Sequence, residues 1–179
     1  MSRKLVIIGP SDKTMPLRFG SIDDYDEWIT QLAVISRDFF NEIIFIPDQG
    51  TYIDFALKFK ELGGKITAVI PSKTPKYIKW AKRYTDSCRI LSDGMGWEFL
   101  NSHIIGEAKH VLCIGFSAGS IIEICSSKYL RLYDGKNFCF MIDARATSTT
   151  LPAELEYELK DIYYFENTTE LRKLMEKLC

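Results

Sequence analysis

A run of small residues, Gly115-Phe116-Ser117-Ala118-Gly119-Ser120, has the composition of an anion-binding turn. It follows an apolar segment, residues 111–114, that is typical of a buried strand. Small side chains let a ligand approach the backbone, and free N–H groups at the start of a following helix attract phosphate. We therefore expect four residues of this run to contact a phosphate-bearing small molecule, with serine hydroxyls as additional donors: Ser117, Ala118, Gly119 and Ser120.

The same run also has a purely structural interpretation. Ser120 and Glu123 have the spacing of a capping box, in which the serine caps the helix and the glutamate accepts from the cap N–H. Glu123 is the one carboxylate close to the run, so it is also the candidate catalytic residue, as an acid, a base or an acceptor for a ribose hydroxyl. Both interpretations remain open, whereas a P-loop is excluded because no lysine follows Gly119.

Two further loops follow apolar segments and carry glycine and hydroxyl residues. Ligands in α/β sheets bind beyond the carboxyl ends of the strands, where both loops would lie. The alternatives are an ordinary turn for the first loop and a capping pair, Thr51 with Asp54, for the second. If these loops bind ligand, the contacting residues are Gly9, Pro10, Ser11, Gly50 and Thr51.

Arg145 is the best-placed cation for a phosphate, because it follows the apolar segment 137–142. Arg18, in the long loop 9–21, is the second choice, and either arginine is alternatively a plain surface residue. The two histidines have no ligand-spaced partner, and the five cysteines form no CxxC pair. The sequence therefore predicts no metal or other cofactor, and it favours reduced thiols in a cytoplasmic protein.

Residues 73–84 combine five basic residues with Tyr77, Trp80 and Tyr84. Basic residues interleaved with aromatics can bind single-stranded nucleic acid. An amphipathic helix with a solvated basic face explains the pattern equally well, and a net charge of −1 gives no general attraction to nucleic acid. We therefore expect no nucleic-acid partner.

These candidate residues lie between short apolar runs that alternate with amphipathic stretches. Such alternation predicts an α/β fold: a three-layer, Rossmann-like domain with a mainly parallel sheet flanked by helices. The 179 residues, 46% of them hydrophobic, suit one domain, residues 1–179, and no apolar stretch is long enough to cross a membrane. The predicted strands are 4–8, 43–46, 65–70, 89–91, 111–114, 137–142 and 162–165, and the predicted helices are 23–39, 51–62, 73–84, 96–108, 119–128 and 168–178.

The segment from Gly115 to Glu123 resembles a degenerate form of the PGGxGTxxE motif of the LONELY GUY family. Proteins of this family, once called lysine decarboxylases, are cytokinin nucleoside-monophosphate phosphoribohydrolases. Their Rossmann-like superfamily includes Smf-type DNA-processing proteins and molybdenum-cofactor carrier proteins. Residues 50–56 and 62–71 are similar to a second family pattern, a glycine-rich turn, a helix, Gly-Gly and a strand ending in proline. The resemblance spans residues 4–142 and implies a homodimer packed through helices.

Two departures from the family pattern bear on activity. Phe116 stands where the family keeps the backbone bare, and residues 100–103 lack the family's catalytic arginine, for which His103 is the available substitute. The leading hypothesis is therefore binding of a nucleotide or other phosphate-bearing molecule, as a sensor or carrier without efficient catalysis. The alternatives are a nucleoside 5′-monophosphate phosphoribohydrolase that uses Glu123 and, third, a single-stranded DNA-binding protein.

Overall fold

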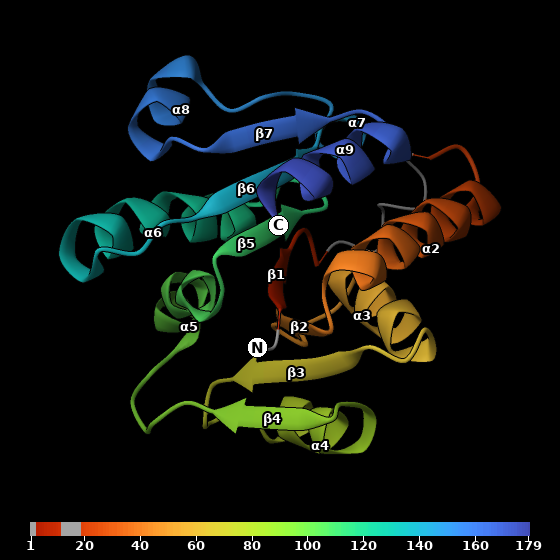
Figure 1. The fold of residues 1–179 in the computed structure, drawn as a ribbon. Coiled ribbons are helices and arrows are strands. Elements are labelled where there is room, and N and C mark those ends of the chain that lie inside the picture. Colours follow the sequence, from red (N-terminus) through yellow and green to blue (C-terminus); the bar gives the residue numbers. More distant parts are fainter. Residues whose placement is uncertain (1–2, 12–18) are drawn as a thin grey trace.

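The computed structural model describes residues 3–11 and 19–179, and within these ranges seven parallel strands form one sheet. The strand order is β4-β3-β2-β1-β5-β6-β7, and helices cover both faces (Figure 1). This arrangement confirms the predicted three-layer, Rossmann-like α/β fold. The strands are β1 (Lys4–Ile8), β2 (Glu42–Phe45), β3 (Lys65–Ile70), β4 (Ser87–Ile90), β5 (His110–Cys113), β6 (Cys139–Asp143) and β7 (Ile162–Phe165).

The helices divide into two groups by the hydrophobic cluster in which their buried residues lie. One cluster gathers residues of α2, α3, α4 and α9, and the other gathers residues of α5, α6 and α8. Their bounds are α2 (Ile22–Phe39), α3 (Thr51–Glu61), α4 (Pro75–Tyr84), α5 (Trp97–Ile104) with the short helix η1 (Ile105–Glu107), α6 (Ala118–Asp134), α7 (Ala144–Thr147), α8 (Ala153–Leu159) and α9 (Thr168–Leu178).

The central strands are apolar throughout because both of their faces are covered. In β1, Leu5 and Ile7 pack in the cluster of α2 and α3, whereas Val6 and Ile8 pack in the cluster of α5 and α6. All four side chains are at most 2% exposed. This alternation fixes the register of β1, because a one-residue slip would exchange its two faces.

The sequence expectation differs from the structure at helix α6, at helices α7 and α8, and at strand β4. The helix predicted to end at residue 128 continues to Asp134, where Gly135 caps it in the left-handed conformation, with φ of 64°. The short helices α7 and α8 were not predicted from the pattern at all. The weak strand predicted at 89–91 lies two residues earlier, at Ser87–Ile90.

The strand order places β1 beside β5, with Leu5 opposite His110. The chain runs from β1 toward β4 on one side of this pair and from β5 toward β7 on the other. Such a reversal separates the loops that follow the two strands, and ligands of open α/β sheets bind in the resulting crevice. Of the described helices, none has the length and hydrophobicity needed to cross a bilayer.

Candidate functional site

A cavity of about 370 Å³ lies beyond the carboxyl ends of β1, β2 and β5. Its walls come from the turn after β1, the start of α3, the start of α5 and the first turns of α6. This is the crevice at the reversal of strand order. Seven of the residues that the sequence singled out line it together: Gly9, Ser11, Ser117, Ala118, Gly119, Ser120 and Glu123.

The first turn of α6 is capped one turn earlier than the sequence pattern indicated. Ser117, not Ser120, is the N-cap residue, and its hydroxyl accepts from the Ser120 N–H at 3.1 Å. The Ser120 hydroxyl in turn accepts from the Ser117 N–H at 2.7 Å. The capping box is thus Ser117 with Ser120, and the predicted pairing of Ser120 with Glu123 is wrong. Glu123 is free of a capping role.

Two backbone donors remain at this helix start. The N–H groups of Ala118 and Gly119 form no hydrogen bond with other described residues, as expected for the first turn of a helix. Gly119 is not crowded, because an added Cβ would make only ordinary contacts, 3.7 Å from the Ser117 hydroxyl oxygen and 3.9 Å from Asn101 Nδ2. Since Gly119 also lines the cavity and carries no side chain, a ligand in the cavity can approach this part of the backbone.

Glu123 projects from the second turn of α6 into the same cavity and is 6% exposed. Its carboxyl group forms no hydrogen bond or ion pair with another described residue. Burial raises the pKa of this carboxyl to about 8, so at neutral pH it is mostly protonated. The wall of the cavity therefore carries a neutral acid, which can donate a hydrogen bond and does not repel an anion.

Five further residues complete the lining, and the sequence pattern had not marked them as ligand contacts. Burial, then Asp48 and Glu123, raise the pKa of the Tyr52 hydroxyl, which lies close to both carboxyls. Asp48 accepts a hydrogen bond from the Tyr77 hydroxyl at 2.9 Å. The sequence offered one signal, since Asp48 lies two residues before Gly50, in the loop that was expected to follow the second strand. The five are Ile46, Asp48, Tyr52, Trp97 and Asn101.

Pro10, Gly50 and Thr51 lie directly behind the cavity wall instead of lining it. The Thr51 hydroxyl donates to the Pro10 carbonyl at 3.0 Å, so it does not cap α3 as predicted. Gly50 has φ of 87°, and an added Cβ would meet the Pro10 carbonyl oxygen at 2.7 Å. The predicted partner Asp54 accepts instead from the Tyr25 hydroxyl at 2.6 Å. These residues hold the turn after β1 against the start of α3.

The structure does not bring the predicted cation to this cavity. Arg145 is exposed, and its guanidinium lies over the Phe19 ring, 5.1 Å from the centroid, beside a separate small cavity. Arg18 falls outside the described residues. His103 does not replace the missing arginine either, because its Nε2 lies 3.0 Å from Glu107 Oε1. Asn101 is the residue of that stretch that reaches the cavity.

Phe116 leaves the backbone of the turn accessible, although its size suggested an obstruction. Its ring packs in the cluster of α5 and α6 and does not line the cavity. In α4, Tyr77 and Trp80 likewise pack inward, against Trp97 and Phe45. This matches the amphipathic-helix interpretation of residues 73–84.

Within residues 3–11 and 19–179, no group of three histidine, cysteine, aspartate or glutamate side chains is arranged to hold a metal ion.

No protein family and no curated protein matches this sequence. Solved structures match its fold at 13–15% identity. The structural-genomics protein TM1055 has a TM-score of 0.72 and 14% identity, over 98% of this chain and 99% of that one. The molybdenum cofactor binding protein of Rippkaea orientalis has a TM-score of 0.65 and 15% identity, over 99% and 98%. DNA processing protein A of Streptococcus pneumoniae has a TM-score of 0.59 and 13% identity, over 95% of this chain and 60% of that one.

These likenesses agree with the Rossmann-like fold that the resemblance of the glycine-rich turn implies. The chain therefore has the Rossmann-like fold shared by TM1055, the molybdenum cofactor binding protein and DNA processing protein A.

Proposed function

We propose that this protein binds a nucleotide or another phosphate-bearing small molecule in the cavity at the start of α6, as a sensor or carrier without efficient catalysis. The observation that carries the proposal is the pair of N–H groups of Ala118 and Gly119, which have no partner among the described residues. They lie at the positive end of a 17-residue helix and at the wall of a cavity of about 370 Å³. That volume is within the range of small-molecule sites.

The remaining walls suit the other parts of such a ligand. Tyr52 and Trp97 offer aromatic surface, and Asn101 and the protonated Glu123 offer hydrogen bonds. The likeness to a molybdenum cofactor binding protein supports a role in holding a small molecule. The lack of a described cation in the lining favours binding over phosphoribohydrolase chemistry, which needs about 8 kcal/mol or more of transition-state stabilisation.

Isothermal titration with AMP, ribose 5-phosphate, inorganic phosphate and adenosine tests this proposal. We expect the phosphorylated compounds to bind and adenosine to bind at least tenfold more weakly, since it lacks the charged group that α6 attracts, a loss of about 1.4 kcal/mol or more. Absence of binding by all four at millimolar concentration, or equal binding of AMP and adenosine, contradicts it.

Gly119→Ala is the matching variant. The added methyl group makes only ordinary contacts with Ser117 and Asn101, so the fold is preserved while access to the N–H groups is obstructed. We expect AMP binding to weaken at least tenfold, a loss of about 1.4 kcal/mol. Gly135→Ala, at the far end of the same helix, is the control and leaves AMP affinity unchanged.

One observation favours catalysis as a second function. Glu123 is protonated near neutral pH and faces the cavity, as a general acid that protonates a departing base would. Release of adenine from AMP, lost in Glu123→Gln while AMP still binds, would establish a nucleotide N-glycosidase. No adenine release by the wild-type protein leaves the binding function alone.

A homodimer packed through α6 completes the proposal. This helix exposes a stripe of large apolar side chains, and Phe99 of the neighbouring α5 is also 41% exposed. Exposed apolar patches of this kind mark interaction surfaces, and the same face on two copies can pack by two-fold symmetry. The stripe consists of Ile122 (49% exposed), Tyr129 (60%), Leu132 (66%) and Tyr133 (81%).

A further inference from the structure

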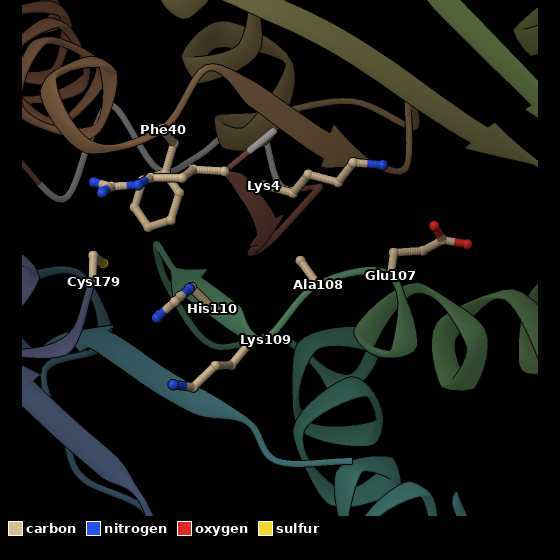
Figure 2. A pocket seen from close by; sticks show the side chains of 8 residues that line it. Lys4, Phe40, Glu107, Ala108, Lys109, His110 and Cys179 are labelled. Carbon is tan, nitrogen blue, oxygen red and sulfur yellow. The ribbon is translucent and has the colours of Figure 1, made fainter. Parts of the chain in front are cut away.

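A second cavity, of about 320 Å³, lies at the opposite edge of the sheet, at the amino ends of β1 and β5. Figure 2 shows it from close by, with side chains entering from both strands, from the residue after α2 and from the residue after α9. Its basic side chains are Arg3, Lys4, Lys109 and His110, and the Phe40 ring and Cys179 lie beside them.

The side chains that line this cavity carry an excess of positive charge. Arg3 and Lys109 are exposed and form no ion pair with another described residue. Lys4 is 3.7 Å from Glu42. Glu107, the one acidic side chain in the lining, is already engaged by Arg89 and by His103. In Figure 2 the Glu107 carboxylate points away from His110, on the same side as the Lys4 amine.

His110 lines the same cavity as Arg3 and Lys109, and both cations act on its pKa. Its ring is 5.4 Å from the Phe40 ring, and its Nε2 donates to the Leu178 carbonyl at 3.0 Å, which leaves Nδ1 without a described partner. Burial lowers the pKa of His110, and Lys109 and Arg3 lower it further, although the bond to Leu178 opposes this. The same two cations lower the pKa of the Cys179 thiol, against the larger effect of burial.

We propose that this cavity binds a small anion carrying at least two negative charges, of the phosphate or polycarboxylate class. Arg3 and Lys109 supply fixed positive charge and hydrogen-bond donors, since guanidinium and ammonium groups are the side chains that bind such anions. An anion between them removes their mutual repulsion and lets His110 take up a proton, which adds a third charge-assisted donor. Phe40 and Ala108 offer apolar surface to a small organic portion.

The chain's two histidines make a direct test by NMR, with His103 as the internal reference. The imidazole Cε1–H signals are followed during titration with sodium phosphate and, separately, sodium citrate, with chloride holding ionic strength constant. We expect a saturable shift of the His110 signal and a rise in its pKa, with His103 unchanged. Saturation by phosphate alone, by citrate alone or by both identifies the class of anion.

Variants separate this site from nonspecific screening and from the cavity at α6. Lys109→Gln and Arg3→Gln each weaken anion binding at His110 about tenfold, as loss of one charge-assisted contact predicts. Lys79→Gln removes the same charge from exposed α4 and changes nothing. Gly119→Ala leaves the His110 titration intact, which shows that the anion is not sensed from the other edge. A nonsaturable shift, equal shifts at both histidines, or full binding in Lys109→Gln overturns the proposal.

Discussion

Glu123 is a residue that the fold accommodates at a cost. A carboxyl group buried without a partner destabilises the folded state whenever the solvent would ionise it, and an apolar or amide side chain of similar size would avoid this penalty. Glu123 faces the cavity, and the proposed function would explain the cost, since a neutral acid can donate to a ligand that a carboxylate would repel. Perturbed carboxyls of this kind concentrate at functional sites.

Glu123→Gln tests this cost through the pH dependence of stability. The pKa of Glu123 is about 8 in the folded state and near the ordinary 4.5 when unfolded, so the wild-type protein loses stability as pH rises from about 4.5 to 8. Glutamine cannot ionise, and the variant keeps what the wild type loses, at most about 5 kcal/mol.

Urea denaturation between pH 4 and pH 9 measures this difference. We expect the free-energy difference between the variant and the wild type to grow with pH up to about 8 and then to level off. Glu154→Gln, which removes an exposed carboxylate in the first turn of α8, is the control. Parallel stability curves for wild type and Glu123→Gln would show that Glu123 is not buried as described.

At the scale of the element, α6 joins the candidate site to the rest of the fold. Its first turn supplies the capping box and the free N–H groups, its buried face packs in the cluster of α5 and α8, and Gly135 ends it. The cap residue also orients the turn that we propose binds ligand, because the Ser117 side chain and backbone hold Ser120 in place. If the proposed function holds, stability and ligand contacts are coupled at the first turn of α6 and independent of each other at its last turn.

Substitutions at the two ends of α6 should separate these effects. Ser117→Ala removes a side-chain cap and should cost about 1 kcal/mol of stability. Gly135→Ala places a Cβ at a φ of 64° and should cost about the same. Thermal unfolding measures both losses, and titration with AMP measures binding. We expect only Ser117→Ala to weaken AMP binding, so equal affinities of the two variants would contradict the role assigned to the first turn.

The elements could be predicted from the sequence where burial is complete. The apolar runs of β1, β3 and β5 predict buried strands in a chain of alternating strands and helices, and the glycine-rich turn after β5 predicted where the candidate site lies. The N-cap residue of α6 could not be predicted from the sequence. Ser117 with Ser120 and Ser120 with Glu123 are overlapping candidate capping pairs, and only the backbone conformation distinguishes them. Helix α8 was missed because it is short and largely exposed, with little apolar periodicity.

At the scale of the molecule, the full lining of the cavity could not be predicted without the strand order of the sheet. Asn101 and Trp97 of α5 reach the start of α6 because β5 lies beside β1, a pairing that spacing along the chain does not reveal. The basic cavity at the amino edge was missed for the same reason. Arg3, Lys109 and Cys179 are far apart in sequence, and only the sheet and the end of α9 bring them together.

The apolar stripe of α6 leads to a prediction about assembly. We expect the protein to sediment as a dimer and the double variant Tyr129→Lys and Tyr133→Lys to sediment as a monomer, since buried lysines without partners would oppose the interface. Leu62→Lys, which adds one charge at an exposed position after α3, is the control and stays dimeric. Analytical ultracentrifugation distinguishes these outcomes, and a dimer that survives both substitutions places the interface elsewhere.

The neighbouring positions of β1 and β5 also set the order in which the molecule can be completed during synthesis. Residues 4–90 contain β1 to β4. During synthesis one edge of β1 therefore stays unpaired until residues 110–113, which form β5, have been made. The cavity at α6 spans this junction, with Gly9 and Ser11 from the early half and Ser117 and Glu123 from the late half. A molecule that binds only when both halves are folded together would stabilise the pairing of β1 with β5 in the newly made chain.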